Sequence, residues 1–511
     1  MSESAAVAHV WTRWLFLRLL AIVFLIAFVS YWVQLDGLIG SKGILPAAEL
    51  MRSAHQLSSG GFWNVPTLCW LGASDAFLHA LAATGTLLTL LLLAGVAQGP
   101  ILVALWAIYL SLVVVGQTFF NFQWDILLLE TAVTSWFIAP WTLAPRHPAA
   151  EPPVPRAGLW LWRSLLFKLM FLSGVVKLIC LDPTWWELRA LDFHYYTQPL
   201  PVWTSWYAQH LPHAFGRASV AIMFVIEMGV PFLLVARRRF RIAGAFVLVG
   251  FQGLIAGTGN YCFFNLLTAV LCVSWLDDAC LIRFVPARWR VGSVPAPRPP
   301  RPIRRALYVG TVAVLAYVSS LTFVEEMVRT APPDRITGAA AWVLDAGSVY
   351  VGLGEPWLTA IGPFRSISGY GLFRSMTTAR PEIVLETSDD GAAWHEVAFR
   401  YKPGDVMRRP RFVAPHQPRL DWQMWFAALN PQRAGPWLER FLMRVLEGSP
   451  AVIRLLDDPG LVAKPPRYVR LVMYEYKFTT AEESKAAGGA WWARERRGEL
   501  TATLSLDSFR R

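Results

Sequence analysis

The chain has 511 residues, of which 55% are hydrophobic and 16% charged, and its mean hydropathy is +0.40. Its net charge of +12 comes largely from arginines in short loops between apolar runs, a pattern that argues against a nucleic-acid-binding protein. The five cysteines form no CxxC pair, which argues against a redox enzyme or a disulfide-stapled domain.

Charge is distributed unevenly along the chain. Residues 1–329 contain 23 Lys and Arg and 15 Asp and Glu, whereas the shorter segment 330–511 contains 24 and 20. Soluble domains carry about 25% charged residues. The division predicts a transmembrane domain over residues 1–329 and a soluble domain over residues 330–511.

Apolar runs long enough to cross a bilayer, which takes about 20 residues, recur through the first part. The first run follows Arg13 and lacks a small-residue cleavage site, so it indicates an uncleaved anchor. The nine predicted spans are 14–33, 76–97, 101–121, 124–141, 159–179, 218–236, 242–258, 260–276 and 305–324.

The arginine-rich loops predict the orientation of these spans. With nine spans, the basic loops 142–158, 237–241 and 277–304 all fall on one side, which the positive-inside rule makes cytoplasmic. Loops 34–75 and 180–217 then lie on the outer side. The C-terminal domain is expected there too, in the periplasm of a bacterium or the lumen of the endoplasmic reticulum of a eukaryote.

The C-terminal domain is predicted to be mostly β with inserted helices. Residues 382–401 contain two strand-like runs around Asp-Asp-Gly, and residues 468–480 and 498–506 are further strand candidates. Residues 419–430 have a helical apolar stripe, with Trp422 placed in the domain core and Asp421 as the cap. The predicted fold is therefore a polytopic α-helical membrane protein of about nine spans followed by this extracytoplasmic domain.

Five charged residues fall inside predicted spans, where charge is costly and commonly functional. Counting about 1.5 Å per residue from the span ends places Lys168 and Glu227 at matching depth, which predicts an ion pair between them. Glu130 lies nearer the outer surface, within reach of Lys177, and Asp125 is expected to cap the fourth span. These charges either fix helix register or line an outward-facing polar cavity, in which Lys177 serves as a base or anion ligand.

The outer loop 180–217 is rich in Trp, Tyr and His. It predicts either an aromatic belt over the outer mouth of the helices or a protein-recognition surface. No metal is expected, because its acidic and histidine residues match no common zinc spacing. The side chains considered are Asp192, His194, Trp185 and Trp186, together with His210 and His213.

A basic and aromatic segment, residues 401–426, lies in the C-terminal domain. It is either a long loop packed across the sheet or a docking surface for another polypeptide. The docking candidates are Arg408, Arg409, Arg411, His416 and Arg419.

Four stretches resemble the lipase maturation factors, namely "FNFQWDILLLE", "WRSLLFKLMFLSGVVKL…DPTWWELRALDFHYYTQPLP", "YGLFRSMTTARPEIVLE" and "FRYKPGDVMRRPRFVAPHQPRLDWQMWFAAL". The resemblance runs from the first spans to the end of the C-terminal domain. It implies a polytopic membrane protein whose C-terminal domain faces the lumen of the endoplasmic reticulum in animals and helps certain homodimeric lipases to mature. The C-terminal domain has no cysteine, which puts a thiol mechanism in doubt here.

The stretch "LSGVVKL…DPTW" is also similar to a segment of the vitamin K-dependent gamma-carboxylases, which would give Lys177 the role of catalytic base. Three functions are therefore expected in order: a maturation factor without enzymatic activity, an intramembrane enzyme using Lys177, and a lipid-binding or transport protein. The expected partners are a client protein, such as a lipase, and membrane lipids. No cofactor and no nucleic acid is expected.

Overall fold

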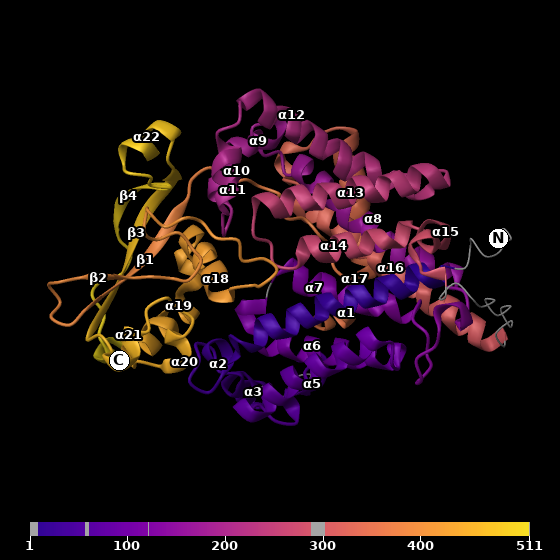
Figure 1. Ribbon diagram of the computed structural model, residues 1–511, viewed down its shortest axis with the longest axis horizontal. Coiled ribbons are helices and arrows are strands. Elements are labelled where there is room, and N and C mark those ends of the chain that lie inside the picture. Colours follow the sequence, from indigo (N-terminus) through magenta and orange to yellow (C-terminus); the bar gives the residue numbers. More distant parts are fainter. Residues whose placement is uncertain (1–8, 57–60, 121, 288–301, 510–511) are drawn as a thin grey trace.

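The computed structural model describes residues 9–56, 61–120, 122–287 and 302–509. Long helices fill one part of the molecule and run roughly along its longest axis, and the small sheet lies at the opposite end from the N-terminus (Figure 1). This arrangement confirms a polytopic helical membrane protein followed by a C-terminal region with a small antiparallel sheet and helices.

Seven helices in the described part of the chain are long and apolar enough to cross a membrane, and a bent helix pair could make an eighth. Two of the nine predicted spans therefore lack a straight spanning helix. Span 124–141 contains α7 (Gln123–Trp136), which has only 14 residues, and span 260–276 contains α14 (Phe264–Cys272), whose continuation bends by 107°. The seven are α1 (Val10–Trp32), α5 (Asp75–Ala94), α6 (Gln98–Val115), α8 (Arg156–Ile179), α12 with its continuation (His213–Val235), α13 (Arg238–Thr258) and α16 (Pro302–Thr330).

The basic loops gather at the end of the bundle that carries the N-terminus. The Asp278 carboxylate accepts the backbone N–H groups of Val10, Trp11 and Thr12 at 2.8–3.0 Å, which satisfies the first turn of α1. Arg13 pairs with Glu151 at 2.7 Å in the same layer. The predicted loop 277–304 is described only as far as residue 287 and again from residue 302.

The outer loops and the C-terminal region share the other end (Figure 1). The outer loops fold into short helices, so they form a structured layer against which the C-terminal region packs. These are α2 (Leu35–Ile39), α3 (Ala47–Gln56), α4 (Gly61–Asn64), α9 (Pro183–Trp186), α10 (Leu191–Thr197) and α11 (Trp203–Gln209).

The C-terminal sheet has the order β2-β1-β3-β4 and is antiparallel throughout. β1 (Pro381–Ser388), β2 (His395–Val397) and β3 (Tyr468–Phe478) lie in the predicted strand segments. The prediction of a strand at 498–506 is wrong, because β4 occupies Trp492–Glu499 and Leu504 makes only an isolated bridge to Val469. β4 is an edge strand with the sequence WARERRGE. Its many charged residues leave no apolar pattern from which a strand could be predicted.

Helices cover this sheet and join it to the bundle. α18 (Arg419–Leu429) matches the predicted helix, but Pro418 rather than Asp421 holds the cap position. Asp421 instead accepts the backbone N–H groups of Tyr401 and Lys402 at 2.8 and 2.9 Å. The remaining helices are α19 (Pro431–Leu446), α20 (Pro450–Ile453), α21 (Gly460–Ala463) and α22 (Ala481–Ala486).

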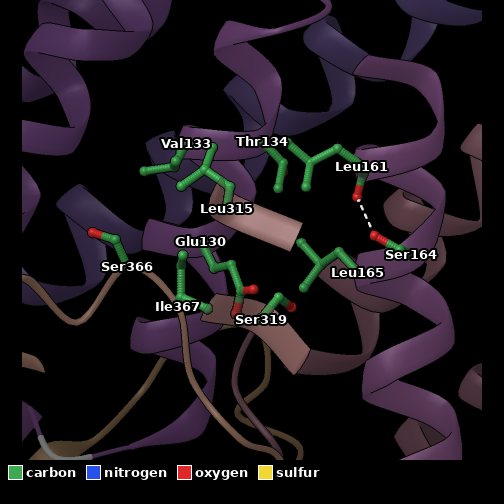
Figure 2. Close-up of a pocket in the computed structure, with 10 residues that line it drawn as sticks. All are labelled: Glu130, Val133, Thr134, Leu161, Ser164, Leu165, Leu315, Ser319, Ser366 and Ile367. Atoms are coloured by element: carbon green, nitrogen blue, oxygen red, sulfur yellow. Dashed lines mark hydrogen bonds between the residues drawn. The ribbon is translucent and has the colours of Figure 1, made fainter. Parts of the chain in front are cut away.

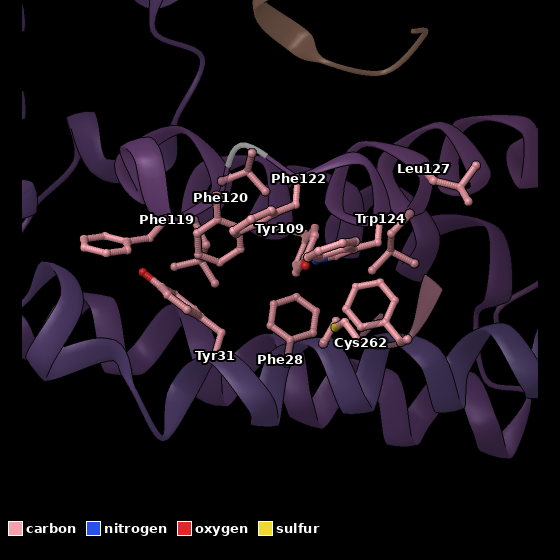
Figure 3. Close-up of a cluster of buried hydrophobic side chains, with 14 of the residues drawn as sticks. Phe28, Tyr31, Tyr109, Phe119, Phe120, Phe122, Trp124, Leu127 and Cys262 are labelled. Carbon is pink, nitrogen blue, oxygen red and sulfur yellow. The ribbon is translucent and has the colours of Figure 1, made fainter. Parts of the chain in front are cut away.

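An aromatic core connects the two regions (Figure 3). Phe28 and Tyr31 of α1 point toward the residues around the start of α7, among them Phe122 and Trp124. The Trp422 ring lies 4.8 Å from that of Trp124 and 5.7 Å from that of Phe122. Trp422 is buried as predicted, but between the membrane region and α18 rather than within the C-terminal domain alone.

One helix has no counterpart among the predicted elements. α17 (Ala339–Ile361) follows α16 after a short turn and packs along it. An extended segment then returns from residue 365 toward β1. The proposed boundary at residue 330 therefore precedes another long helix, and it stays a prediction.

Candidate functional site

Two lysine–glutamate pairs lie inside the bundle, with partners other than those predicted. Lys168 Nζ donates to Glu130 at 2.5 Å, and Lys177 Nζ donates to Glu227 at 2.7 Å. The predicted Lys168–Glu227 and Lys177–Glu130 pairs are therefore wrong. Depth was counted from the predicted span ends, whereas α12 begins at His213, earlier than predicted, and extends past the outer end of α8. Glu227 consequently lies level with Lys177.

Glu130 connects the bundle to the segment that leads into the C-terminal region. Its second oxygen accepts the Tyr370 hydroxyl at 2.5 Å and the Ser368 backbone N–H at 3.3 Å. Beside this carboxylate is a small pocket enclosed by α7, α8, α16 and the returning segment, and Figure 2 shows Glu130 and Ser319 pointing into it. Its polar lining residues are Glu130, Thr134, Ser164, Ser319 and Ser366.

Lys177 is fully engaged by its neighbours. Besides Glu227, its ammonium group donates to the Ser173 carbonyl at 2.8 Å and lies 5.4 Å from the Trp185 ring centroid. Its side chain is only 6% exposed. The ammonium group is thus enclosed by a carboxylate, a carbonyl and an aromatic face, whereas a general base must present its nitrogen to a substrate.

Asp125 does not cap α7 but forms an ion pair with the C-terminal region. Phe122 holds the cap position, and the Asp125 carboxylate accepts both terminal nitrogens of Arg419 at 2.9 Å. The Tyr109 hydroxyl donates to the same carboxylate at 2.5 Å. The two charged side chains are 0% and 1% exposed, and the guanidinium lies 3.6 Å from the centroid of Phe120. Arg419 is therefore a buried anchor rather than part of a docking surface.

Among the outer-loop candidates, Trp185 contacts the segment that leads into the C-terminal region. Trp185 is buried and donates to the Phe373 carbonyl at 3.1 Å, whereas Trp186 is 59% exposed. Asp192 accepts from Arg189 at 3.2 Å and lies 2.9 Å from His213.

His194 lies farther inside, next to the turn between α13 and α14. Its Nε2 is 3.0 Å from the Tyr261 hydroxyl. Burial, and then the positive charge of Lys177, lower the pKa of His194 to about 4. This histidine is therefore neutral at physiological pH and forms part of the packing.

The basic docking candidates separate into buried and exposed side chains. His416 lies 2.9 Å from the Ser30 hydroxyl of α1, and burial followed by the charge of Arg419 lowers its pKa to about 4. Arg408 is held by the Phe399 carbonyl at 2.7 Å and by Asp457. Arg409 and Arg411 are exposed, with Arg409 4.5 Å from the Trp203 ring. A surface pocket brings these arginines together with Arg400, Tyr401, Asp405 and Trp492.

Several residues that join the two regions gave no signal in the sequence. Arg380 is fully buried, donates to the carbonyls of Tyr196 and Pro199 at 2.7 and 2.9 Å, and pairs with Glu382. Asn260 accepts the backbone N–H of Val413 at 2.8 Å. The contacts of Arg380 with Tyr196 and Pro199, and of Asn260 with Val413, bridge segments more than 150 residues apart, so no local pattern could predict them.

The described part of the chain contains no group of three or more His, Cys, Asp or Glu side chains placed to hold a metal. The five cysteines, Cys69, Cys180, Cys262, Cys272 and Cys280, are free thiols.

Both parts of the chain match known protein-family domains. Residues 11–283 match the lipase maturation factor transmembrane domain, and residues 366–502 match the lipase maturation factor C-terminal domain. The chain is 36% identical to lipase maturation factor 2 of Gallus gallus over 97% of this chain and 81% of that protein. It is 37% identical to lipase maturation factor 2 of Homo sapiens, over 97% and 82% respectively, and 32% identical to human lipase maturation factor 1, over 99% and 91%. No solved structure matches it. These matches over nearly the whole chain show that it belongs to the lipase maturation factor family.

Proposed function

We propose that this protein is a membrane-anchored maturation factor that holds folding clients, lipases among them, against its C-terminal region outside the cytoplasm. The family supports the maturation role. The observation that carries the docking site is the surface pocket lined by Arg400, Arg408, Arg409 and Arg411 beside Trp492. Arginine and aromatic side chains are favoured anchors in protein interfaces.

The bundle gives this surface a fixed position. The Asp125–Arg419 pair, the Glu130–Tyr370 hydrogen bond and the contacts of Arg380 attach the C-terminal region to the end of the bundle opposite the arginine-rich loops. The positive-inside rule makes those loops cytoplasmic. The C-terminal region then faces the lumen of the endoplasmic reticulum in a eukaryotic cell, or the periplasm if the protein resides in a bacterial inner membrane.

Charge reversal of the exposed pocket arginines tests the docking proposal. The variant Arg409→Glu/Arg411→Glu is expected to lose most secreted client activity, measured per amount of membrane-inserted factor, because both side chains are exposed and contribute little to folding. The matched control is Arg433→Glu/Arg454→Glu, which reverses two exposed arginines of the same region outside the pocket. Equal activity of the two variants would refute the docking site.

The enzymatic alternative is tested by removing Lys177 together with its partner. Lys177→Gln alone would leave the Glu227 carboxylate buried without its counter-charge, so the variant for this test is Lys177→Gln/Glu227→Gln. We expect this double variant to retain client activity. If the double variant loses client activity at normal abundance while Arg409→Glu/Arg411→Glu leaves that activity unchanged, the result would instead favour Lys177 as a base.

A further inference from the structure

The second half of α17 and the turn after it carry an unexplained apolar surface. Among its exposed side chains, Val349 is 65%, Leu353 76% and Trp357 46% accessible. Such exposure over three turns is unusual for a helix in a soluble domain. Neither family domain covers this segment, since the matches end at residue 283 and resume at residue 366.

α17 runs antiparallel to the membrane helix α16. Gly347 faces Val324 and Val328, and Gly354 faces Leu321 so closely that an added Cβ would lie 2.4 Å from it. The contact positions on α16 thus fall toward the membrane interior as the residue number on α17 rises. Farther toward the membrane interior, α16 itself exposes apolar side chains, with Val314 and Leu307 at 41% and 67% exposure.

Exposed charge on α16 sets the depth that α17 reaches. Glu325 is exposed and marks the outer edge of the hydrocarbon, because an unpaired carboxylate is costly deeper in the membrane. Leu321 lies one turn below it, about 6 Å at 1.5 Å per residue, and Gly354 lies at the same level. Asp345 is exposed and lies on the aqueous side of the Glu325 level, which agrees with this depth. Glu355 follows Gly354 and so lies about 6 Å below that level, but helical side chains tilt toward the N-terminus, which directs its carboxylate back toward the headgroups.

The segment after α17 turns back within the membrane region. Ser366 accepts the indole N–H of Trp106 at 2.7 Å, and Trp106 lies nine residues from the outer end of α6, or about 13–14 Å. Non-helical backbone at such depth is tolerated only where protein or a polar cavity encloses it. Glu130 and Gln123 supply that environment by accepting the backbone N–H groups of Ser368 and Gly371 at 3.3 Å.

We infer that residues 347–371 form a re-entrant hairpin in the outer leaflet, with acyl chains of membrane lipids covering the apolar edge of α17. The hairpin enters along α16, turns near mid-membrane and returns beside Glu130 to the C-terminal region. The membrane region would then extend to about residue 371 rather than end at residue 329.

Depth-dependent fluorescence quenching in the full-length protein tests this inference. A fluorophore on Leu353→Cys, in a background with the five native cysteines replaced, is compared with the same label on Asp345→Cys in phosphatidylcholine vesicles. We expect nitroxide on the upper acyl chain to quench the Leu353 label several-fold more than the Asp345 label, and aqueous iodide to show the reverse order. Val349→Cys repeats the measurement if the label at residue 353 disturbs folding.

Two outcomes would overturn the inference. Equal iodide quenching at positions 345, 349 and 353 would place the whole of α17 in water. Protection of positions 349 and 353 from both quenchers would show that protein, either a second copy or another membrane helix, covers the surface instead of lipid.

Discussion

The buried Asp125–Arg419 pair is one of the contacts that attach the C-terminal region, and removing one of its partners is expected to weaken that attachment. Arg419→Met removes the charge and keeps much of the side-chain volume, but it leaves the Asp125 carboxylate, which is 0% exposed, without its counter-charge. Removing one partner of a buried pair costs about 3–5 kcal/mol. At about 1.4 kcal/mol per factor of ten, the population of the detached state should rise by roughly 10² to several times 10³.

Limited proteolysis in detergent micelles measures this population, because cleavage of a transiently opened state tracks its equilibrium fraction when reclosing is fast. The double variant Arg419→Met/Asp125→Asn should bring the cleavage rate most of the way back to that of the unmodified protein, since no uncompensated charge remains. Arg433→Met, which removes an exposed arginine of α19, is the matched control and should change the rate little. If Arg419→Met is cleaved no faster than the control, or the double variant shows simple additivity, the pair is not the anchor.

The remaining predictions concern the ion pairs of the bundle and the contact between the bundle and the C-terminal region, called the joint below. Glu130→Gln should largely rescue Lys168→Met in a stability assay, whereas Glu227→Gln should add to its cost; the opposite pattern would restore the partners expected from depth alone. The pKa of His194 is about 4 in the folded protein against an ordinary 6.5, so its contribution to stability is complete above pH 6.5 and lost as pH falls toward 4. His194→Gln should therefore flatten the dependence of the melting temperature on pH between 6.5 and 4. An unchanged slope would contradict the assignment. Trp422→Ala should cost about 3–5 kcal/mol and accelerate proteolytic release of the C-terminal region while the bundle stays inserted, and simultaneous loss of both regions would contradict its place at the joint.

Hydropathy and local pattern predicted what depends on neighbouring residues. Continuous apolar runs gave the helices of the bundle, and the stripe over residues 419–430 gave α18 within one residue. The same reasoning failed for β4, because an edge strand of alternating charge has no apolar face for a pattern to detect. It also passed over α17, whose acidic residues interrupt its apolar run.

Partner choice within the bundle could not be predicted, for a geometrical reason. Depth along one span fixes the level of a charge only if every helix begins at the same plane. α12 begins earlier than its apolar run, so Glu227 lies nearer the outer surface than counting suggested and meets Lys177. Arg419 shows the same limit across domains. A basic residue beside an aromatic stripe is typical of a protein-binding surface. Only the fold shows that Arg419 is buried against the Asp125 carboxylate, 294 residues away.

The carboxylates near the outer end of the bundle share a structural role that connects the fold to the proposed function. Asp125 holds Arg419, Glu130 holds Tyr370, and Glu326 of α16 holds Arg374 at 2.6 Å. Apolar packing alone would let the C-terminal region slide over the bundle, whereas hydrogen-bonded charges stabilise one arrangement and penalise others. A surface that must grip a folding client benefits from such a fixed base, because less conformational entropy is lost when the client binds. Under the proposed function, these charges would support client binding indirectly, by holding the arginine pocket in place.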